Sequence, residues 1–195
     1  MKIQKYAAEL LGTFVLTLAV FFSLTAGLPL GTAIVAGLTV GLFVYTVGAI
    51  SGAHFNPAVT IGIASVGKLQ IKDAVLYVIF QVIGALLAML VAKNLTGTVP
   101  ALVTANTWQV GVGEFIGTFL LAFAVTAVTY KNVPADAAGL TIGGSLALGA
   151  MLAGGLSNAL LNPAVMLGVG AFSWMYLFAP IAGAVVAAWV FRFLR

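Results

Sequence analysis

The fold is decided by nine residues in the first half of the chain, Ser51-Gly52-Ala53-His54-Phe55-Asn56-Pro57-Ala58-Val59. They decide it because a related stretch recurs in the second half. The second copy reads Ser157-Asn158-Ala159-Leu160-Leu161-Asn162-Pro163-Ala164-Val165, and its Asn follows the first by 106 residues (162 minus 56). Two further blocks, 8–14 (AELLGTF) and 113–119 (GEFIGTF), recur at a spacing of 105 residues (114 minus 9). Two matched pairs at nearly the same spacing predict an internal duplication.

The composition indicates a protein that lies within a membrane. Only 6% of the 195 residues are charged and 63% are hydrophobic, whereas roughly 25% of an ordinary soluble domain is charged. So few polar groups cannot cover the surface of a soluble fold, which excludes soluble enzymes and nucleic-acid binders. The chain has no cysteine, so disulfides and thiolate metal sites are excluded. We therefore expect no enzyme activity, no cofactor, no metal site and no nucleic-acid partner.

The apolar stretches are long enough to cross a bilayer as helices. A helix rises about 1.5 Å per residue, so about 20 residues span roughly 30 Å of hydrocarbon. Strands of a membrane barrel alternate apolar and polar residues, and runs such as 16–22 (LTLAVFF) do not alternate. The sequence thus predicts an all-α integral membrane protein with six transmembrane helices at about 6–26, 31–50, 73–92, 109–130, 137–156 and 174–193.

Two further apolar segments, 57–67 and 163–171, are too short to cross. Eleven helical residues reach only about 16 Å, so we expect re-entrant half-helices. Each copy of the duplication then holds three spans and one half-helix. Because three is odd, the second copy enters the membrane from the opposite face, which is an inverted repeat. We expect a single membrane domain over 1–195, built from repeats at about 1–95 and 106–195.

The positive charges predict the orientation. With both termini inside, the inner segments hold seven of the eight basic residues: Lys2, Lys5, Lys68, Lys72, Lys131, Arg192 and Arg195. Only Lys93 falls in an outer loop. Since basic residues concentrate on the cytoplasmic side, we expect a multi-pass protein of the cell (plasma or inner) membrane with both termini in the cytoplasm.

The repeated Asn-Pro-Ala motif predicts where the half-helices begin and what they do. Asn is a strong N-cap and Pro suits the first helical position. In an inverted repeat both helix N-termini then meet near the bilayer centre, each with a partial positive charge and unpaired N–H groups. Non-helical backbone at that depth must be buried or line water. We predict pore motifs at Asn56, Pro57, Ala58, Asn162, Pro163 and Ala164, with vestibule residues Gly52, Ala53, His54, Asn158 and Leu160.

On these motifs, together with Ala8-Glu9 and Gly12-Thr13 in the first span, the chain resembles the aquaporin and aquaglyceroporin (major intrinsic protein) family along essentially its whole length. The resemblance implies six spans with two half-helices, a pore in each subunit and a homotetramer in the lipid bilayer. It also implies passive transport of water and small neutral solutes, such as glycerol-like polyols, urea or ammonia.

The sequence departs from this family at the selectivity filter. The family usually places an Arg after its second Asn-Pro-Ala, and Val165 stands there. Counting from the two Asn residues carries the other filter positions to Ala36, Ala150 and Ala159. A ring this small, apolar and uncharged predicts a permissive channel rather than a strict water filter. A shifted loop alignment, or Phe43 leaning inward, is the alternative.

Glu9, Glu114 and His54 are the ionisable residues within the predicted membrane region whose roles are considered next. Glu9 and Glu114 occupy matching positions, where the resemblance implies that each supports a half-helix loop. Proton coupling and a simple interfacial position are the alternatives. His54 could gate or line the vestibule, or it could pair with a loop carbonyl, and we favour the structural role.

Two other functions fit parts of the pattern. Inverted repeats with broken helices also build secondary transporters, although few intramembrane charges favour a channel here. A structural membrane protein of low conductance is the third class.

Overall fold

Apolar sequence without strand-like alternation folds into helices, which satisfy their own backbone hydrogen bonds. The computed structural model describes residues 3–26 and 29–195, and within them every regular element is helical. In chain order the elements are α1 (Gln4–Thr25), α2 (Thr32–Ser51), α3 (Pro57–Ser65), α4 (Ile71–Thr96), α5 (Trp108–Thr129), η1 (Ala135–Ala137), α6 (Ala138–Ala153), α7 (Pro163–Gly168) and α8 (Trp174–Leu194).

Six of the described helices are long and apolar enough to cross a membrane, which confirms the predicted fold class. Most bounds lie within a few residues of those expected. The span predicted at 137–156 is shorter, because α6 ends at Ala153 before Gly154 and Gly155. The half-helix α7 is also shorter than predicted, because the chain turns after Gly168 and reaches Gly170 at φ 74°.

The outer surface of the helices is apolar. Large exposed apolar side chains occur on all six long helices, for example Leu11, Leu42, Leu90, Ile116, Leu148 and Phe178. A water-soluble monomer rarely exposes so much contiguous apolar surface. Such a surface is suited to contact lipid or another membrane-spanning subunit.

The helices pack in pairs that repeat between the two halves. Helix α1 packs against α4 as α5 packs against α8, and α2 crosses α6. Each half-helix also packs against the last long helix of the other half, α3 against α8 and α7 against α4. Glycine allows both contacts, since a Cβ on Gly62 or Gly168 would lie 2.8 Å from the carbonyl oxygen of Ala184 or Ala85. The division into two inverted repeats remains a prediction, and this paired packing supports it.

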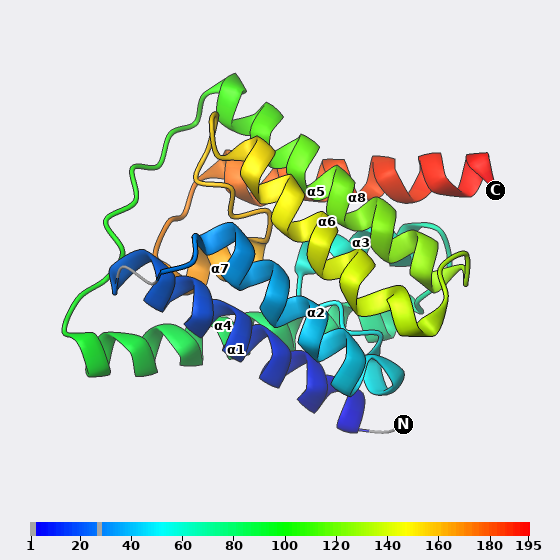
Figure 1. Cartoon of the computed structure of the whole chain (residues 1–195), viewed down its shortest axis with the longest axis horizontal. Helices are drawn as coiled ribbons and strands as arrows, with labels where there is room; N and C mark the ends of the chain where they lie inside the picture. The colour runs from blue at the N-terminus through cyan, green and yellow to red at the C-terminus, as the bar shows by residue number, and fades with distance from the viewer. Residues whose placement is uncertain (1–2, 27–28) are drawn as a thin grey trace.

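Figure 1 shows where the half-helices and the ends of the chain lie. Helix α3 lies toward the end of the molecule that carries the C-terminus, and α7 lies toward the opposite end. The start of α1 is at the same end as the C-terminus, as an even number of crossings requires. Lys2, which contributed to the predicted orientation, lies outside the described residues.

Candidate functional site

The two Asn-Pro pairs begin the half-helices. Asn56 and Asn162 both have extended backbone, with φ −153°, and each is followed by a helix with Pro in its first turn. The side-chain oxygen of Asn56 accepts from the Ala58 N–H at 2.9 Å. The oxygen of Asn162 accepts from the Ala164 N–H at 3.0 Å and from the Val165 N–H at 3.3 Å. Both side chains thus satisfy helix N–H groups that would otherwise be unpaired.

The nitrogens of the same two amides join the halves of the protein. Asn56 Nδ2 donates to the backbone carbonyl of Leu161 at 2.8 Å, and Asn162 Nδ2 donates to that of Phe55 at 2.9 Å. Each amide nitrogen carries two protons, so one proton of each remains for another acceptor. The two half-helix N-termini are therefore held face to face, and within residues 3–26 and 29–195 each Asn keeps one N–H without an acceptor.

The loops that precede the half-helices have matching, unusual backbones. Ala53 and Phe55 have φ of 52° and 49°, and their counterparts 106 residues later, Ala159 and Leu161, have φ of 50° and 51°. This left-handed conformation costs a residue with a side chain roughly 1–2 kcal/mol. Four such residues persist only where neighbouring groups hold the loops in place.

Glu9 on α1 holds the first loop. Its carboxylate is fully buried. Oε1 accepts from the Ser51 hydroxyl at 2.7 Å and from the His54 N–H at 3.0 Å. Oε2 accepts from the Phe55 N–H at 2.7 Å. These are charge-assisted hydrogen bonds, which are stronger than neutral ones.

Glu114 on α5 holds the second loop with the same groups. Oε1 accepts from the Ser157 hydroxyl at 2.7 Å and from the Leu160 N–H at 3.0 Å, and Oε2 accepts from the Leu161 N–H at 2.6 Å. This carboxylate is also fully buried. Full burial contradicts the alternative that these two acids are interfacial.

The first loop has an additional polar chain. Gln81 on α4 donates to Glu9 Oε2 at 2.7 Å and to the Thr60 hydroxyl at 2.9 Å. The same hydroxyl lies 3.2 Å from Nδ1 of His54, whose side chain is buried and lines the cavity described below. His54 is thus bound to a side chain rather than to the loop carbonyl that the sequence suggested.

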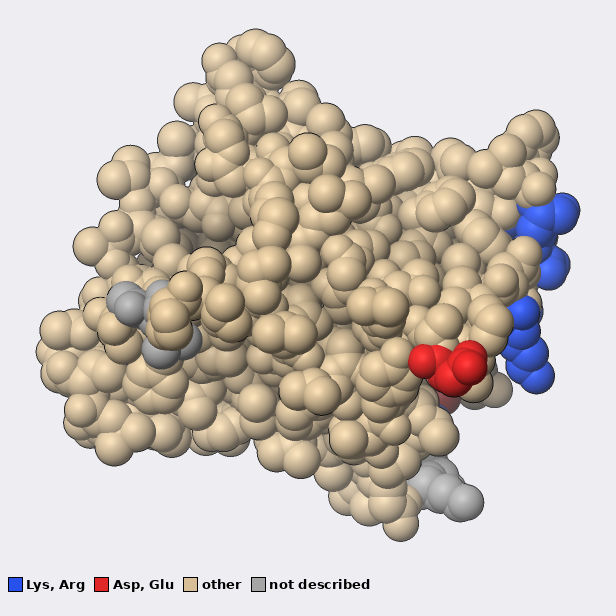
Figure 2. Space-filling view, viewed as in Figure 1, with Lys and Arg blue, Asp and Glu red and all other residues tan. Residues whose placement is uncertain are grey.

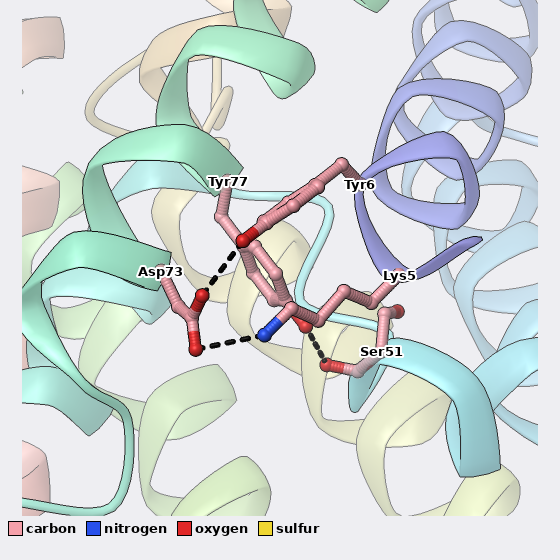
Figure 3. A network of polar contacts seen from close by, with 5 residues as sticks. All are labelled: Lys5, Tyr6, Ser51, Asp73 and Tyr77. Atoms are coloured by element: carbon pink, nitrogen blue, oxygen red, sulfur yellow. Dashed lines mark hydrogen bonds and ion pairs between the residues drawn. The ribbon is translucent and has the colours of Figure 1, made fainter. Parts of the chain in front are cut away.

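A second network ties the same loop to the end of the molecule that carries the termini (Figure 3). The Tyr77 hydroxyl donates to the Ser51 carbonyl at 2.7 Å. The Tyr77 ring packs edge-on against the Tyr6 ring. The Tyr6 hydroxyl donates to Asp73 at 2.7 Å, and Asp73 also pairs with Lys5 at 2.7 Å. Helices α1, α2 and α4 are therefore joined next to the loop.

One cavity of about 350 Å³ connects these elements. Its lining includes the four predicted filter residues Ala36, Ala150, Ala159 and Val165, both Asn side chains, and Ala53, His54, Asn158 and Leu160. Gly52 is not among the lining residues; it ends α2 at φ 90°. Pro57, Ala58, Pro163 and Ala164 are buried in the half-helices and are not among the lining residues. Phe43 packs edge-on against the Phe55 ring and does not line this cavity.

Sequence reasoning missed the apolar wall of the cavity that the two Asn side chains also line. Its aliphatic side chains come from four long helices: Leu16, Val20, Val40, Leu121, Val125, Ile142 and Leu146. Leu102, from the connection between α4 and α5, also lines the cavity. The Asn158 amide holds this connection by donating to the Val103 carbonyl at 3.0 Å. Apolar residues within membrane spans carry no signal that separates a pore wall from a lipid face. In the described part of the chain, no group of acidic or His side chains could hold a metal ion.

A bundle of six membrane-length helices around a cavity, with two half-helices meeting inside it, defines a membrane channel. The chain matches the major intrinsic protein family over residues 1–191. It is 40% identical to aquaporin NIP1-2 of Arabidopsis thaliana, over 99% of this chain and 74% of that protein. It is 38% identical to nodulin-26 of Glycine max, over 99% of this chain and 78% of that protein.

The same fold occurs in a solved structure. The aquaglyceroporin from Plasmodium falciparum superimposes with a TM-score of 0.80 at 22% identity, over 98% of this chain and 94% of that one. The protein therefore belongs to the major intrinsic protein family, whose members are channels for water and small solutes.

Proposed function

We propose that this protein is a passive channel for water and small neutral solutes, with a permissive filter formed by Ala36, Ala150, Ala159 and Val165. One observation carries the proposal: the four small side chains line the same cavity as the Asn56 and Asn162 amides. Each amide has one N–H that is not used between the halves. A solute hydroxyl or a water molecule accepts from these donors as it passes.

We expect the cavity walls to exclude ions. An ion that enters must exchange its hydration shell for pore groups. Here the apolar wall and the alanine ring supply no charge, and the donors at the centre face a cation with positive dipole ends. A neutral solute gives up much less hydration free energy than an ion, since each unpaired polar group costs on the order of 1–3 kcal/mol.

The same cavity supports a broader range of solutes than water alone. Val165 presents methyl groups where an Arg would present donors and narrow the passage. Alanine at the three other positions adds little volume. We therefore expect glycerol-sized molecules to pass together with water.

The test is stopped-flow permeability of the purified protein in liposomes, compared between water, glycerol, urea, ammonia and protons. We expect all the neutral solutes to equilibrate faster than in empty vesicles, while proton flux stays at the level of empty vesicles. Saturable uptake coupled to a gradient would identify a carrier instead. Permeability equal to empty vesicles for every solute would leave only the structural role.

We also propose a homotetramer in the cell membrane with both termini in the cytoplasm. The one-sided distribution of Lys and Arg supports the orientation. Because the chain has no cysteine, Lys93→Cys and Arg195→Cys give matched single-cysteine proteins. A membrane-impermeant maleimide applied to intact cells should label the cysteine introduced at position 93 and leave the one at 195 unlabelled. Cross-linking of the purified protein should end at four subunits.

A further inference from the structure

Two basic side chains share one aromatic ring at the end of the molecule that carries the C-terminus. Lys68 Nζ lies 4.2 Å from the centre of the Tyr130 ring, and the guanidinium carbon of Arg195 lies 3.9 Å from the same centre. Lys68 lies between α3 and α4, Tyr130 directly follows α5, and Arg195 ends the chain. Three segments far apart in the sequence thus bring two positive charges to the same aromatic ring.

In the described part of the chain, the two charges have no acidic partner. Among residues 3–26 and 29–195, the ion pair that forms is Lys5 with Asp73. The face of Tyr130 attracts each cation, and the C-terminus of α5 adds a partial negative charge of about one half. Neither effect neutralises two full charges. In Figure 2, the basic side chains visible on this face gather at the end of the molecule where the C-terminus lies, and an acidic side chain is visible near the lower of them.

Two exposed apolar side chains directly precede Arg195 in the sequence, at the end of α8. Phe193 is 87% exposed and Leu194 is 67% exposed, between Arg192 and Arg195. The Arg192 guanidinium also lies over the ring of Trp189, which is half exposed. Two exposed apolar side chains between two basic ones at the end of a membrane helix suit the lipid interface, where the apolar groups contact acyl chains and the cations reach the phosphates.

We propose that Lys68, Tyr130 and Arg195 form a binding surface for the phosphate of an anionic membrane lipid, with Phe193 contacting its acyl chains. Charge complementarity selects an anion. The exposed Phe193 and Leu194 favour a lipid over a free phosphate ion, because only the lipid has acyl chains that can contact them. This surface does not line the cavity, so the inference stands apart from the proposed transport.

The test measures lipid binding to the full chain in detergent by native mass spectrometry, with phosphatidylglycerol and phosphatidylcholine as probes. We expect the wild-type protein to prefer phosphatidylglycerol. A basic residue near an anionic surface contributes roughly a factor of five in affinity. The double variant Lys68→Gln/Arg195→Gln should therefore bind phosphatidylglycerol about 25-fold more weakly and phosphatidylcholine unchanged.

Matched variants distinguish binding at this surface from a general effect of positive charge. Lys93→Gln removes an exposed base near the other end of the membrane and should leave the preference intact. Tyr130→Phe keeps the ring and should bind as wild type, whereas Tyr130→Leu should bind more weakly. Equal wild-type affinity for the two lipids, or a double variant that keeps the full preference, would overturn the proposal. So would competition by millimolar inorganic phosphate, which would identify a free-anion site.

Discussion

The Asn162 side chain donates to the carbonyl of Phe55, and this bond is the partner of the one between Asn56 and Leu161. The two acceptor carbonyls differ in whether they have a second donor. The Leu161 carbonyl also accepts from the Thr118 hydroxyl at 3.3 Å. Within the described residues, the Phe55 carbonyl accepts from Asn162 alone. The junction between the half-helices therefore depends more on Asn162 than on Asn56.

This asymmetry predicts unequal effects of replacing each Asn by Asp. Asp still caps a helix, but its carboxylate cannot donate to a carbonyl. Asn162→Asp leaves the Phe55 carbonyl without a donor, whereas Asn56→Asp leaves Leu161 with Thr118. An unpaired buried carbonyl costs about 1–3 kcal/mol, and each kcal/mol lowers the unfolding temperature by roughly 2–4 °C in a chain of this size. Thermal unfolding in detergent should show the lower midpoint for Asn162→Asp, and the reverse order would contradict this account.

The local rules that act within a few residues made the half-helices predictable. Asn56-Pro57 and Asn162-Pro163 each specify a cap and a first turn, and both form. The support of the loops was only half predictable. Glu9 and Glu114 repeat in the sequence, but Gln81 and Thr60 do not, since Met166 stands 106 residues after Thr60. Contacts that occur in only one half cannot be found by comparing the two halves of the sequence. These contacts also depend on α4 packing beside α1.

Glu9→Gln should destabilise the protein more than Glu114→Gln. Each oxygen of Glu9 accepts from two donors, the second on Oε2 being Gln81. Whichever way the Gln amide turns, its nitrogen replaces an oxygen that accepts two hydrogen bonds. Glu114 Oε2 accepts only one described hydrogen bond, so the amide nitrogen there displaces one donor. At about 1–3 kcal/mol for each buried unpaired group, the unfolding midpoint should fall by roughly 10 °C for Glu9→Gln and by about half as much for Glu114→Gln.

The same pair of variants tests proton coupling. In the fraction of Glu9→Gln protein that folds, solute flux should vary with pH as it does in the wild-type protein. If flux instead became independent of pH while the unfolding midpoint stayed at the wild-type value, the acids would carry protons rather than support the loops.

The crossing of α2 and α6 depends on Gly143 but not on the adjacent Gly144. A Cβ at Gly143 would overlap the carbonyl oxygen of Gly37 on α2, whereas a Cβ at Gly144 would meet no atom within 4 Å. Gly143→Ala should therefore force the helices apart at a cost of about 1–3 kcal/mol. Gly144→Ala should raise stability by up to about 1 kcal/mol, because alanine favours the helix. Chemical or thermal unfolding of the two variants measures this difference, and equal midpoints would mean that the crossing is looser than the structure describes.

Val165→Arg tests the filter directly. Val165 is buried beside the cavity and shares it with Ala36, Ala150 and Ala159. An Arg here adds donors and bulk, so the passage should narrow toward the size of water. We expect glycerol permeability in liposomes to fall at least about tenfold, as a steric change in a fitted site can produce, while water permeability falls much less. Val165→Met adds length without charge and should reduce glycerol flux by a smaller factor. If the ratio of glycerol to water permeability stayed the same in a Val165→Arg protein with normal thermal stability, the narrowest point of the channel would lie elsewhere, and Leu102 would be the next position to replace.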